Sequence, residues 1–283
     1  MPQVVIHPDV PLNVVILSHG ERHLAPSYFE RGWLICLKDV RIEADFRFLS
    51  AIRLPRDVRR GHVKFMLTHE DHAAFDGKRK ETWALFRQRV FDQRMSDYFR
   101  FVDQVRSVNE QLHTIASTYF PRYRFQRKRV CWKFEEIPEG QNLHIDNIDG
   151  CERQGQLRVF TNLSTGLRKW SMAQHLSVYA RRHYASAGLD RFVRQPFAFN
   201  NALTEAAFGY SHQSVPDPRH LVDFEPGEVW IVNSAVVAHQ VRYGTLLALD
   251  LLEFPYEDYE DPSRALPAIL ADLEAACGRQ AAV

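Results

Sequence analysis

Short β-type segments separated by turn residues fill the second half of the sequence, and they constrain the fold more than any other feature. Beyond Pro121, runs rich in Val, Ile, Leu, Phe and Trp alternate with turns that contain Gly, Asn, Asp or Pro. These runs read RVCWKFEEI, NLHIDN, GQLRVFTNL, GEVWIVN, AVVAHQV and TLLALDLLEF. A doubly wound parallel sheet would alternate strands with helices throughout, so the pattern instead predicts a β-sandwich or jelly roll.

Helical patterns flank and interrupt these strands. Residues 80–120 contain no Gly or Pro and repeat apolar side chains at helical spacing, which predicts one long helix or two consecutive ones. We also expect a helical insert over 171–206 and a last helix within SRALPAILADLEAACG. Two short strands are expected earlier, at 13–18 and 32–37, on either side of a turn-rich stretch.

The chain is interpreted as one mainly β domain with flanking helices, covering residues 1–283. Strands and supporting helices occupy 1–120, a jelly-roll core with the helical insert occupies 121–255, and a C-terminal helix occupies 256–283. Four scattered cysteines lack Cys-x-x-Cys spacing, which favours buried free thiols over a zinc knuckle or a disulfide framework.

Charge and hydropathy exclude several classes of protein. The formal net charge is +1, so no global field favours nucleic acid or an anionic membrane. No apolar run reaches the roughly 18 residues that a membrane helix needs, and the N-terminus does not resemble a signal peptide. We therefore expect a cytoplasmic protein. A basic, aromatic run, PRYRFQRKRVCWK, is interpreted as a solvated strand edge rather than a nucleic-acid surface, with contact to an anionic substrate as the second interpretation.

The triplet His-x-Asp in NLHIDNIDG is the first candidate for a metal site. Two more such triplets, at 7–9 and 69–71, show that the triplet alone decides little. On a strand, alternate side chains point the same way, so His144 and Asp146 converge while the apolar residues beside them anchor the opposite face. The first of the other triplets has a central proline near the chain end, and the second has the character of an acidic loop or helix start.

A third ligand is expected on a later strand. The stretch EPGEVWIVNSAVVAHQV contains a Pro-Gly-Glu turn, a strand, a second turn and a strand that carries His239. Two histidines and one carboxylate form the facial triad of non-haem iron, which leaves one face of the ion open. Together with the strand-borne triplet, His239 predicts a metal site.

This combination resembles the double-stranded β-helix oxygenases, a cupin-like jelly-roll superfamily that uses Fe(II), 2-oxoglutarate and O2. The resemblance implies that His144, Asp146 and His239 bind iron, and that 2-oxoglutarate chelates it through the keto-acid end. The other carboxylate of 2-oxoglutarate needs a cation, usually Arg. In many members this Arg follows the distal His at a spacing where the present chain has Leu249, and Arg242 lies much closer to His239.

Another cation lies in the strand GQLRVFTNLS. By alternation, Arg158, Phe160 and Asn162 share one face, opposite Leu157 and Val159. If the aliphatic residues pack outward against helices, Arg158 projects into the barrel. On alternation alone, an exposed strand Arg is an equal alternative.

The run LRVFTNLSTGLRKW and the end LLALDLLEFPYEDYEDPSRALPAILADL are similar to the Kdo hydroxylases. These oxygenases hydroxylate the 3-deoxy-octulosonic acid sugar of bacterial lipopolysaccharide. The resemblance spans most of 80–275 and implies that Arg158 anchors 2-oxoglutarate, helped by Arg129 and by a hydrogen bond from Asn162. The segment before NLHIDN is shorter than in that family, and Asn147 replaces a small residue. These departures lie near the expected mouth of the site, so the chemistry transfers better than the substrate.

The implied reaction is the oxidative decarboxylation of 2-oxoglutarate to succinate and CO2, coupled to hydroxylation of a small polar or sugar-acid substrate, with an anionic molecule as one option. If that substrate is lipid-linked, contact with a membrane surface is peripheral, and the oligomeric state is left open. One alternative is a cupin-like isomerase or hydrolase that shares the three ligands but does not use 2-oxoglutarate and does not need a buried Arg158. Another is a metal-free, sugar-binding β-sandwich.

Overall fold

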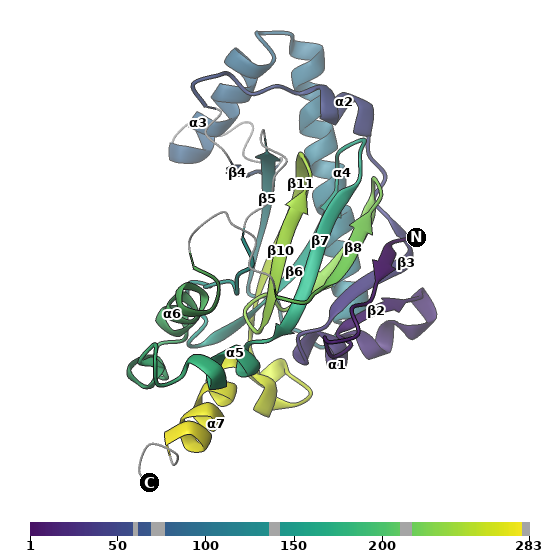
Figure 1. Ribbon diagram of the computed structural model, residues 1–283. Coiled ribbons are helices and arrows are strands. Elements are labelled where there is room, and N and C mark those ends of the chain that lie inside the picture. The colour runs from purple at the N-terminus through teal and green to yellow at the C-terminus, as the bar shows by residue number, and fades with distance from the viewer. Residues whose placement is uncertain (59–61, 69–76, 136–141, 210–216, 279–283) are drawn as a thin grey trace.

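The computed structural model describes residues 1–58, 62–68, 77–135, 142–209 and 217–278. Two β-sheets pack face to face with helices outside them, as Figure 1 shows. The predicted fold class, a mainly β jelly roll with flanking helices, is confirmed.

The larger sheet runs in the order β2-β3-β9-β6-β11-β5-β4. Its strands are β2 (Val14–Leu17), β3 (Leu34–Arg41), β9 (Glu228–Val232), β6 (Gln154–Asn162), β11 (Leu246–Pro255), β5 (Arg127–Glu135) and β4 (His62–Met66). The smaller sheet contains β1 (Gln3–Val5), β8 (His220–Phe224), β7 (Arg168–His175) and β10 (Val237–Tyr243), in the order β1-β8-β7-β10. All described pairs are antiparallel except β2 with β3.

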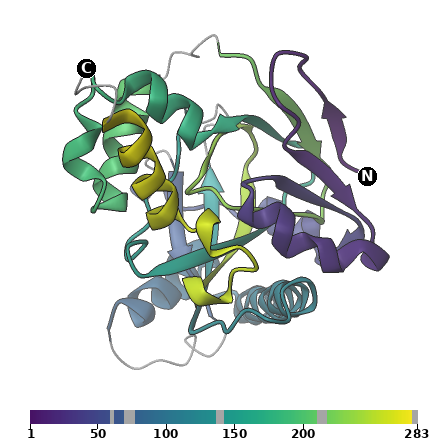
Figure 2. The same cartoon turned by 90° about the horizontal axis from the view of Figure 1, so that it is seen from below.

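Helices cover the outside of the sheets in two groups. The N-terminal group contains α1 (Ala25–Glu30), α2 (Phe46–Ala51), α3 (Gly77–Leu85) and the long α4 (Met95–Tyr119), and apolar side chains of α4 share one core with those of the larger sheet. The second group contains α5 (Leu176–His183), α6 (Pro196–Phe208) and α7 (Leu266–Gly278). These three helices contact one another at one end of the molecule, as both views show (Figures 1 and 2).

The predicted helical stretch 80–120 forms two helices, α3 and α4. A π-type turn at Phe86–Val90 follows α3, and Asp92 and Gln93 then adopt φ values of 47° and 60°, which end the first helix and redirect the chain. Helix α4 ends just before Pro121, as expected from the missing N–H of proline.

The start of the helical insert was predicted wrongly. Residues 168–175 form β7, and helix begins only at Leu176. Most of β7 is buried on both faces, so its sequence RKWSMAQH lacks the polar and apolar alternation by which a half-exposed strand is recognised. The helices of the insert, α5 and α6, then extend to Phe208.

The two faces of β6 pack into two different hydrophobic cores. Leu157 and Val159 pack into the core that contains α4, whereas Phe160 packs with Trp170 and Trp230 between the two sheets. This is the alternation predicted from GQLRVFTNLS. All four cysteines are free, and three of them are buried. Within the described ranges, no helix has the length and apolar character needed to cross a bilayer.

Candidate metal centre

His144 and His239 are held opposite each other by a short antiparallel bridge. The backbone N–H of His144 donates to the carbonyl of His239 at 3.0 Å, and the N–H of His239 donates back at 2.9 Å. Asp146 is fixed two residues further on, where its N–H donates to Ser234 O at 2.9 Å. The segment around His144 was expected to be a strand. It forms only this isolated bridge, yet it has the extended alternation on which the prediction relied.

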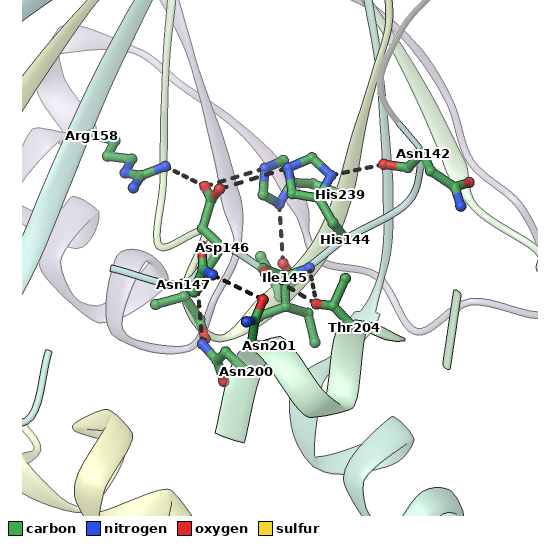
Figure 3. Close-up of polar contacts among 12 residues, drawn as sticks. Asn142, His144, Ile145, Asp146, Asn147, Arg158, Asn200, Asn201, Thr204 and His239 are labelled. Carbon is green, nitrogen blue, oxygen red and sulfur yellow. Dashed lines mark hydrogen bonds and ion pairs between the residues drawn. The ribbon is translucent and has the colours of Figure 1, made fainter. Parts of the chain in front are cut away.

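The side chains of His144, Asp146 and His239 converge on one point (Figure 3), with one donor atom of each within 4.8 Å of the others. His144 Nε2 lies 3.7 Å from Asp146 Oδ1, and His239 Nε2 lies 3.5 Å from Asp146 Oδ2. These two imidazoles and one carboxylate match the donor set of a facial triad, so the residues fit a divalent metal such as iron. The structure therefore brings together the three predicted ligands.

Backbone carbonyls fix the tautomers of both histidines. Nδ1 of His144 lies 2.8 Å from Asn142 O, and Nδ1 of His239 lies 3.3 Å from Val237 O. Because a carbonyl oxygen only accepts, each Nδ1 must carry the proton and donate, which leaves a lone pair on each Nε2. The two lone pairs face Asp146, as metal ligands require.

Electrostatics also prepares these groups for a metal. Burial lowers the pKa of His239 to about 3, and the neighbouring His144 adds to this lowering, so the imidazole of His239 is neutral at pH 7. Burial acts to raise the pKa of Asp146, but the Arg158 guanidinium and the two histidines outweigh it and hold that pKa well below its usual range. The carboxylate is thus ionised and able to bind a cation.

Helix α6 supports the ligand segment from behind. Asn200 is fully buried, and its Nδ2 donates to Asp146 O and to Ala235 O, both at 2.9 Å. One turn later, Thr204 Oγ1 accepts from Ile145 N and donates to Ile145 O, both at 3.2 Å (Figure 3). The sequence analysis missed these two positions, although an Asn and a Thr four residues apart on one helix face was a usable signal.

A cavity of about 210 Å³ opens beside the three ligands. Its described lining residues are Lys64, Met66, Cys131, Lys133, His144, Asp146, Asn147, Arg158, Phe160, Trp170, His239, Val241, Leu249 and Leu251. They come from β4, β5, β6, β7, β10 and β11 and from the ligand segment, so the cavity lies inside the jelly roll. Asn147 is exposed, in keeping with its predicted position near the mouth.

Arg158 projects into this cavity, as one of its two sequence interpretations required. Its side chain is only 14% exposed, and its Nη1 forms an ion pair with Asp146 Oδ2 (Figure 3). Its Nε donates to Gln156 Oε1 at 2.8 Å. Leu249, at the spacing where many oxygenases carry the anchoring Arg, lines the same cavity with an apolar side chain. Arg242 follows Val241, which lines the cavity, but is not itself among the described lining residues.

The structure does not bring Arg129 and Asn162 to the ligands. Arg129 forms an ion pair with Glu253, and neither residue is among the described lining of the cavity. Asn162 is fully buried and holds a turn, because its Nδ2 donates to Gly166 O at 2.8 Å and to Phe224 O at 3.0 Å, while its Oδ1 accepts from Ser164. The predicted hydrogen bond from Asn162 to a co-substrate is therefore corrected to a structural role.

Of the two other His-x-Asp triplets, the one at 7–9 is not part of this centre. Nδ1 of His7 accepts from the N–H of Asp9 at 3.2 Å, in an exposed turn near the N-terminus. The triplet at 69–71 lies outside the described residues.

No protein-family model matches the chain, and no curated protein matches it. Solved structures share its fold. KdoO, a Kdo hydroxylase described as a non-haem Fe(II) alpha-ketoglutarate dependent dioxygenase, superposes with a TM-score of 0.63 and 14% identity, covering 94% of this chain and 96% of that chain. The complex of KdoO with alpha-ketoglutarate and Fe(III) gives the same values. The resemblance to the Kdo hydroxylases is therefore confirmed at the level of the fold, a double-stranded β-helix.

Proposed function

We propose that this protein is an Fe(II)- and 2-oxoglutarate-dependent dioxygenase that hydroxylates a C–H bond of a small polar or sugar-acid molecule, with release of succinate and CO2. The observation that supports this most is the convergence of His144, Asp146 and His239 beside the buried guanidinium of Arg158 in one cavity of a jelly roll. KdoO, which shares this fold, binds both alpha-ketoglutarate and iron.

Each ligand residue has a defined task in this proposal. His144 and His239 hold the metal through Nε2, and their Nδ1–H bonds to backbone carbonyls keep the rings oriented. Asp146 supplies the anionic ligand, on a backbone clamped by Asn200. Iron bound by three residues keeps open positions for 2-oxoglutarate and O2 and supplies the oxidising chemistry.

Arg158 is the proposed anchor for a carboxylate of 2-oxoglutarate. Its planar guanidinium offers a carboxylate two parallel hydrogen bonds, and the bond from its Nε to Gln156 orients that plane. Its ion pair with Asp146 places it directly beside the metal ligands. A cupin-like isomerase or hydrolase would have no use for this buried cation, so Arg158 favours the oxygenase over that alternative.

The apolar part of the lining keeps the site dry. Phe160, Leu249 and Leu251 come from the larger sheet, whereas Val241 and Trp170 come from the smaller one. The Trp170 ring stacks on that of His239, with 5.4 Å between centroids and 21° between planes. Exclusion of water strengthens the ionic contacts in the cavity and protects oxidative chemistry from side reactions.

An anaerobic titration with Fe(II) and then 2-oxoglutarate tests the proposal, because the chelate of the two gives a weak visible charge-transfer band. We expect the band in the wild-type protein, and in Arg158→Ala only at about tenfold or higher 2-oxoglutarate, since a charge-assisted bidentate contact is lost. Arg242→Ala is the matched control, because Arg242 is not among the described lining residues of the cavity, and should behave as wild type.

Three other outcomes of the titration would change the proposal. Iron binding without a band would replace the proposal by a cupin-like metal enzyme that does not use 2-oxoglutarate. Absence of metal binding would leave the metal-free β-sandwich. A band that is indifferent to Arg158→Ala would retain the chemistry but remove Arg158 as the anchor.

A further inference from the structure

Glu253 lies between two arginines on the inner face of the larger sheet. Arg129 on β5 and Arg158 on β6 are both register partners of Leu251 on β11, which lines the cavity. Glu253 follows two residues later on β11, so its side chain projects from the same face. Each arginine is therefore a diagonal neighbour of Glu253, at about 7–8 Å, a separation that long side chains span. The carboxylate is thus within reach of both guanidinium groups.

Glu253 is held by partners other than Arg158. It is buried, its Oε1 forms an ion pair with Arg129, and its Oε2 accepts from Gln154 Nε2 at 2.9 Å. Of the described residues, Arg129 alone forms an ion pair with Glu253. A buried carboxylate that loses its only cationic partner is costly, so removal of Arg129 would favour any arrangement that brings another cation to Glu253.

Gln156 shows that Arg158 is the cation at hand. Gln156 lies directly opposite Glu253 in the register of β6 and β11, which sets their Cβ atoms about 4.5–5.5 Å apart. The Nε of Arg158 donates to Gln156 Oε1 at 2.8 Å, so the Arg158 side chain extends toward the row that contains Glu253. Arg158 therefore has two carboxylates nearby. It pairs with Asp146, while Arg129 occupies the other.

We propose that Arg129 is a positioning residue for the co-substrate, which keeps Glu253 from capturing the guanidinium of Arg158. This inference rests on the proposed dioxygenase function and adds a residue that controls its co-substrate site from outside the cavity. Arg129 and Glu253 are not among the described lining residues, so their influence on a molecule bound there passes through Arg158. While Arg129 holds Glu253, Arg158 stays available to a carboxylate of 2-oxoglutarate.

Arg127 provides a matched control on the same strand. It is the register partner of Glu253 on β5 and lies on the same face as Arg129. Its side chain is exposed, and it does not form the ion pair with Glu253 that Arg129 forms. Replacement of Arg127 by Gln therefore makes the same change of charge in the same place without releasing Glu253.

Anaerobic titration of the Fe(II)-loaded protein with 2-oxoglutarate, followed by the visible band of the chelate, tests the inference. In Arg129→Gln, we expect half-saturation at about fivefold or more 2-oxoglutarate than in the wild type, because Glu253 then pairs with Arg158. Arg127→Gln should behave as wild type. Arg129 is 32% exposed and Gln is polar, so the variant should fold, and thermal melting of each protein checks this.

Neutralising Glu253 supplies the decisive comparison. Arg129→Gln/Glu253→Gln should recover the wild-type affinity for 2-oxoglutarate, because no carboxylate then draws Arg158 away from the cavity. If Arg129 instead contacted the co-substrate, the double variant would bind it as weakly as Arg129→Gln does, and the inference would be overturned. An equal loss of affinity in Arg127→Gln would overturn it as well, since any nearby positive charge would then have the same effect.

A second background separates capture of Arg158 from long-range electrostatics. In Arg158→Ala, no guanidinium remains for Glu253 to capture, so the further change Arg129→Gln should leave the affinity for 2-oxoglutarate unchanged. If Arg129→Gln lowers the affinity by the same factor in this background as in the wild type, Arg129 does not act through Arg158.

Failure of this inference differs from failure of the dioxygenase proposal, because the wild-type titration is read first. A missing band in wild-type protein that has bound iron refutes the dioxygenase. A normal wild-type band whose 2-oxoglutarate dependence does not change in Arg129→Gln refutes only the positioning role of Arg129.

Discussion

The guanidinium of Arg158 forms an ion pair with the carboxylate of Asp146, so a residue assigned to the co-substrate contacts a residue assigned to the metal. Both side chains are largely buried, at 14% and 21% exposure. In the absence of a metal, Arg158 is the main positive charge that stabilises the ionised Asp146. A metal bound at the proposed site would therefore compete with Arg158 for one carboxylate, which would couple the proposed metal site to the proposed co-substrate site.

Replacement of Arg158 by Ala is expected to weaken the metal-free fold and to strengthen metal binding. Loss of the partner leaves Asp146 as a poorly compensated buried charge, which should cost about 1–3 kcal/mol after allowance for partial exposure. Mn(II) supplies the missing charge without a competing cation. It should therefore raise the melting temperature of Arg158→Ala more than that of the wild type, with Arg242→Ala as the control. An equal rise in all three proteins would show that Arg158 and the metal do not compete.

The buried amide of Asn200 should control the geometry of the ligand segment. In Asn200→Ala, the carbonyls of Asp146 and Ala235 lose their shared donor, and stability should fall by about 1–3 kcal/mol. Metal affinity should fall by about tenfold or more, as is typical when groups that orient metal ligands are removed. The control is Asn201→Ala, one residue along α6, whose amide meets Asn147 at the surface. If chemical denaturation and Mn(II) titration give the same values for both variants, Asn200 does not position the ligands.

Two of the three candidate metal ligands could be paired from the sequence because their geometry is local. Alternation along an extended segment puts His144 and Asp146 on one face, and no tertiary information is needed for that step. The same alternation left two directions open for Arg158, and the resemblance to the Kdo hydroxylases favoured the inward one. Residues 171–175 of β7 were assigned to the helical insert because residues buried on both faces show no period of two.

The failures at Arg129 and Asn162 have a different cause. Both lie on the same face of their strands as cavity residues, Cys131 on β5 and Phe160 on β6, so alternation was correct for them. Alternation does not specify how far along the barrel axis a side chain lies, or which residue from a distant part of the sequence it contacts. Arg129 forms an ion pair with Glu253, and the side-chain amide of Asn162 donates to Gly166 O in a turn. For the same reason the position of Glu253 between Arg129 and Arg158 was not foreseen, since it depends on register between strands far apart in sequence.

His175 should make stability depend on pH between about 6.5 and 4. Burial lowers its pKa to about 4, and its Nδ1 accepts a hydrogen bond from Ser177 N at the start of α5, which a protonated ring cannot do. As the pH falls through this range, the unfolded chain binds a proton at His175, whereas the buried ring in the folded protein stays neutral. Folding stability should therefore fall, by at most about 3 kcal/mol, whereas above pH 6.5 the contribution is fully present.

His175→Asn isolates this effect, because Asn caps helices well and does not titrate. Denaturant unfolding at a series of pH values, from about 7.5 down to about 4, should show equal stability of variant and wild type at the upper end. The variant should then become the more stable protein as the pH is lowered. Parallel curves over the whole range would contradict the role of His175.

Leu249→Arg should restore co-substrate binding to Arg158→Ala. Leu249 lies on β11 opposite Phe160, two residues from the partner of Arg158, and it lines the cavity. An Arg at this position would project into the same cavity from the neighbouring strand, and the shortened side chain at position 158 would leave room for it. We expect the Fe(II) and 2-oxoglutarate band of Arg158→Ala/Leu249→Arg to saturate at about tenfold less 2-oxoglutarate than that of Arg158→Ala.

Arg158→Ala/Leu249→Met controls for the change in side-chain shape, because Met fills the space without a charge. Rescue by Arg and not by Met requires that a cation in this cavity, from either strand, holds the carboxylate. If neither double variant recovers the band, a guanidinium on β11 cannot replace the one on β6. Binding of 2-oxoglutarate would then require an Arg at position 158, beside Asp146.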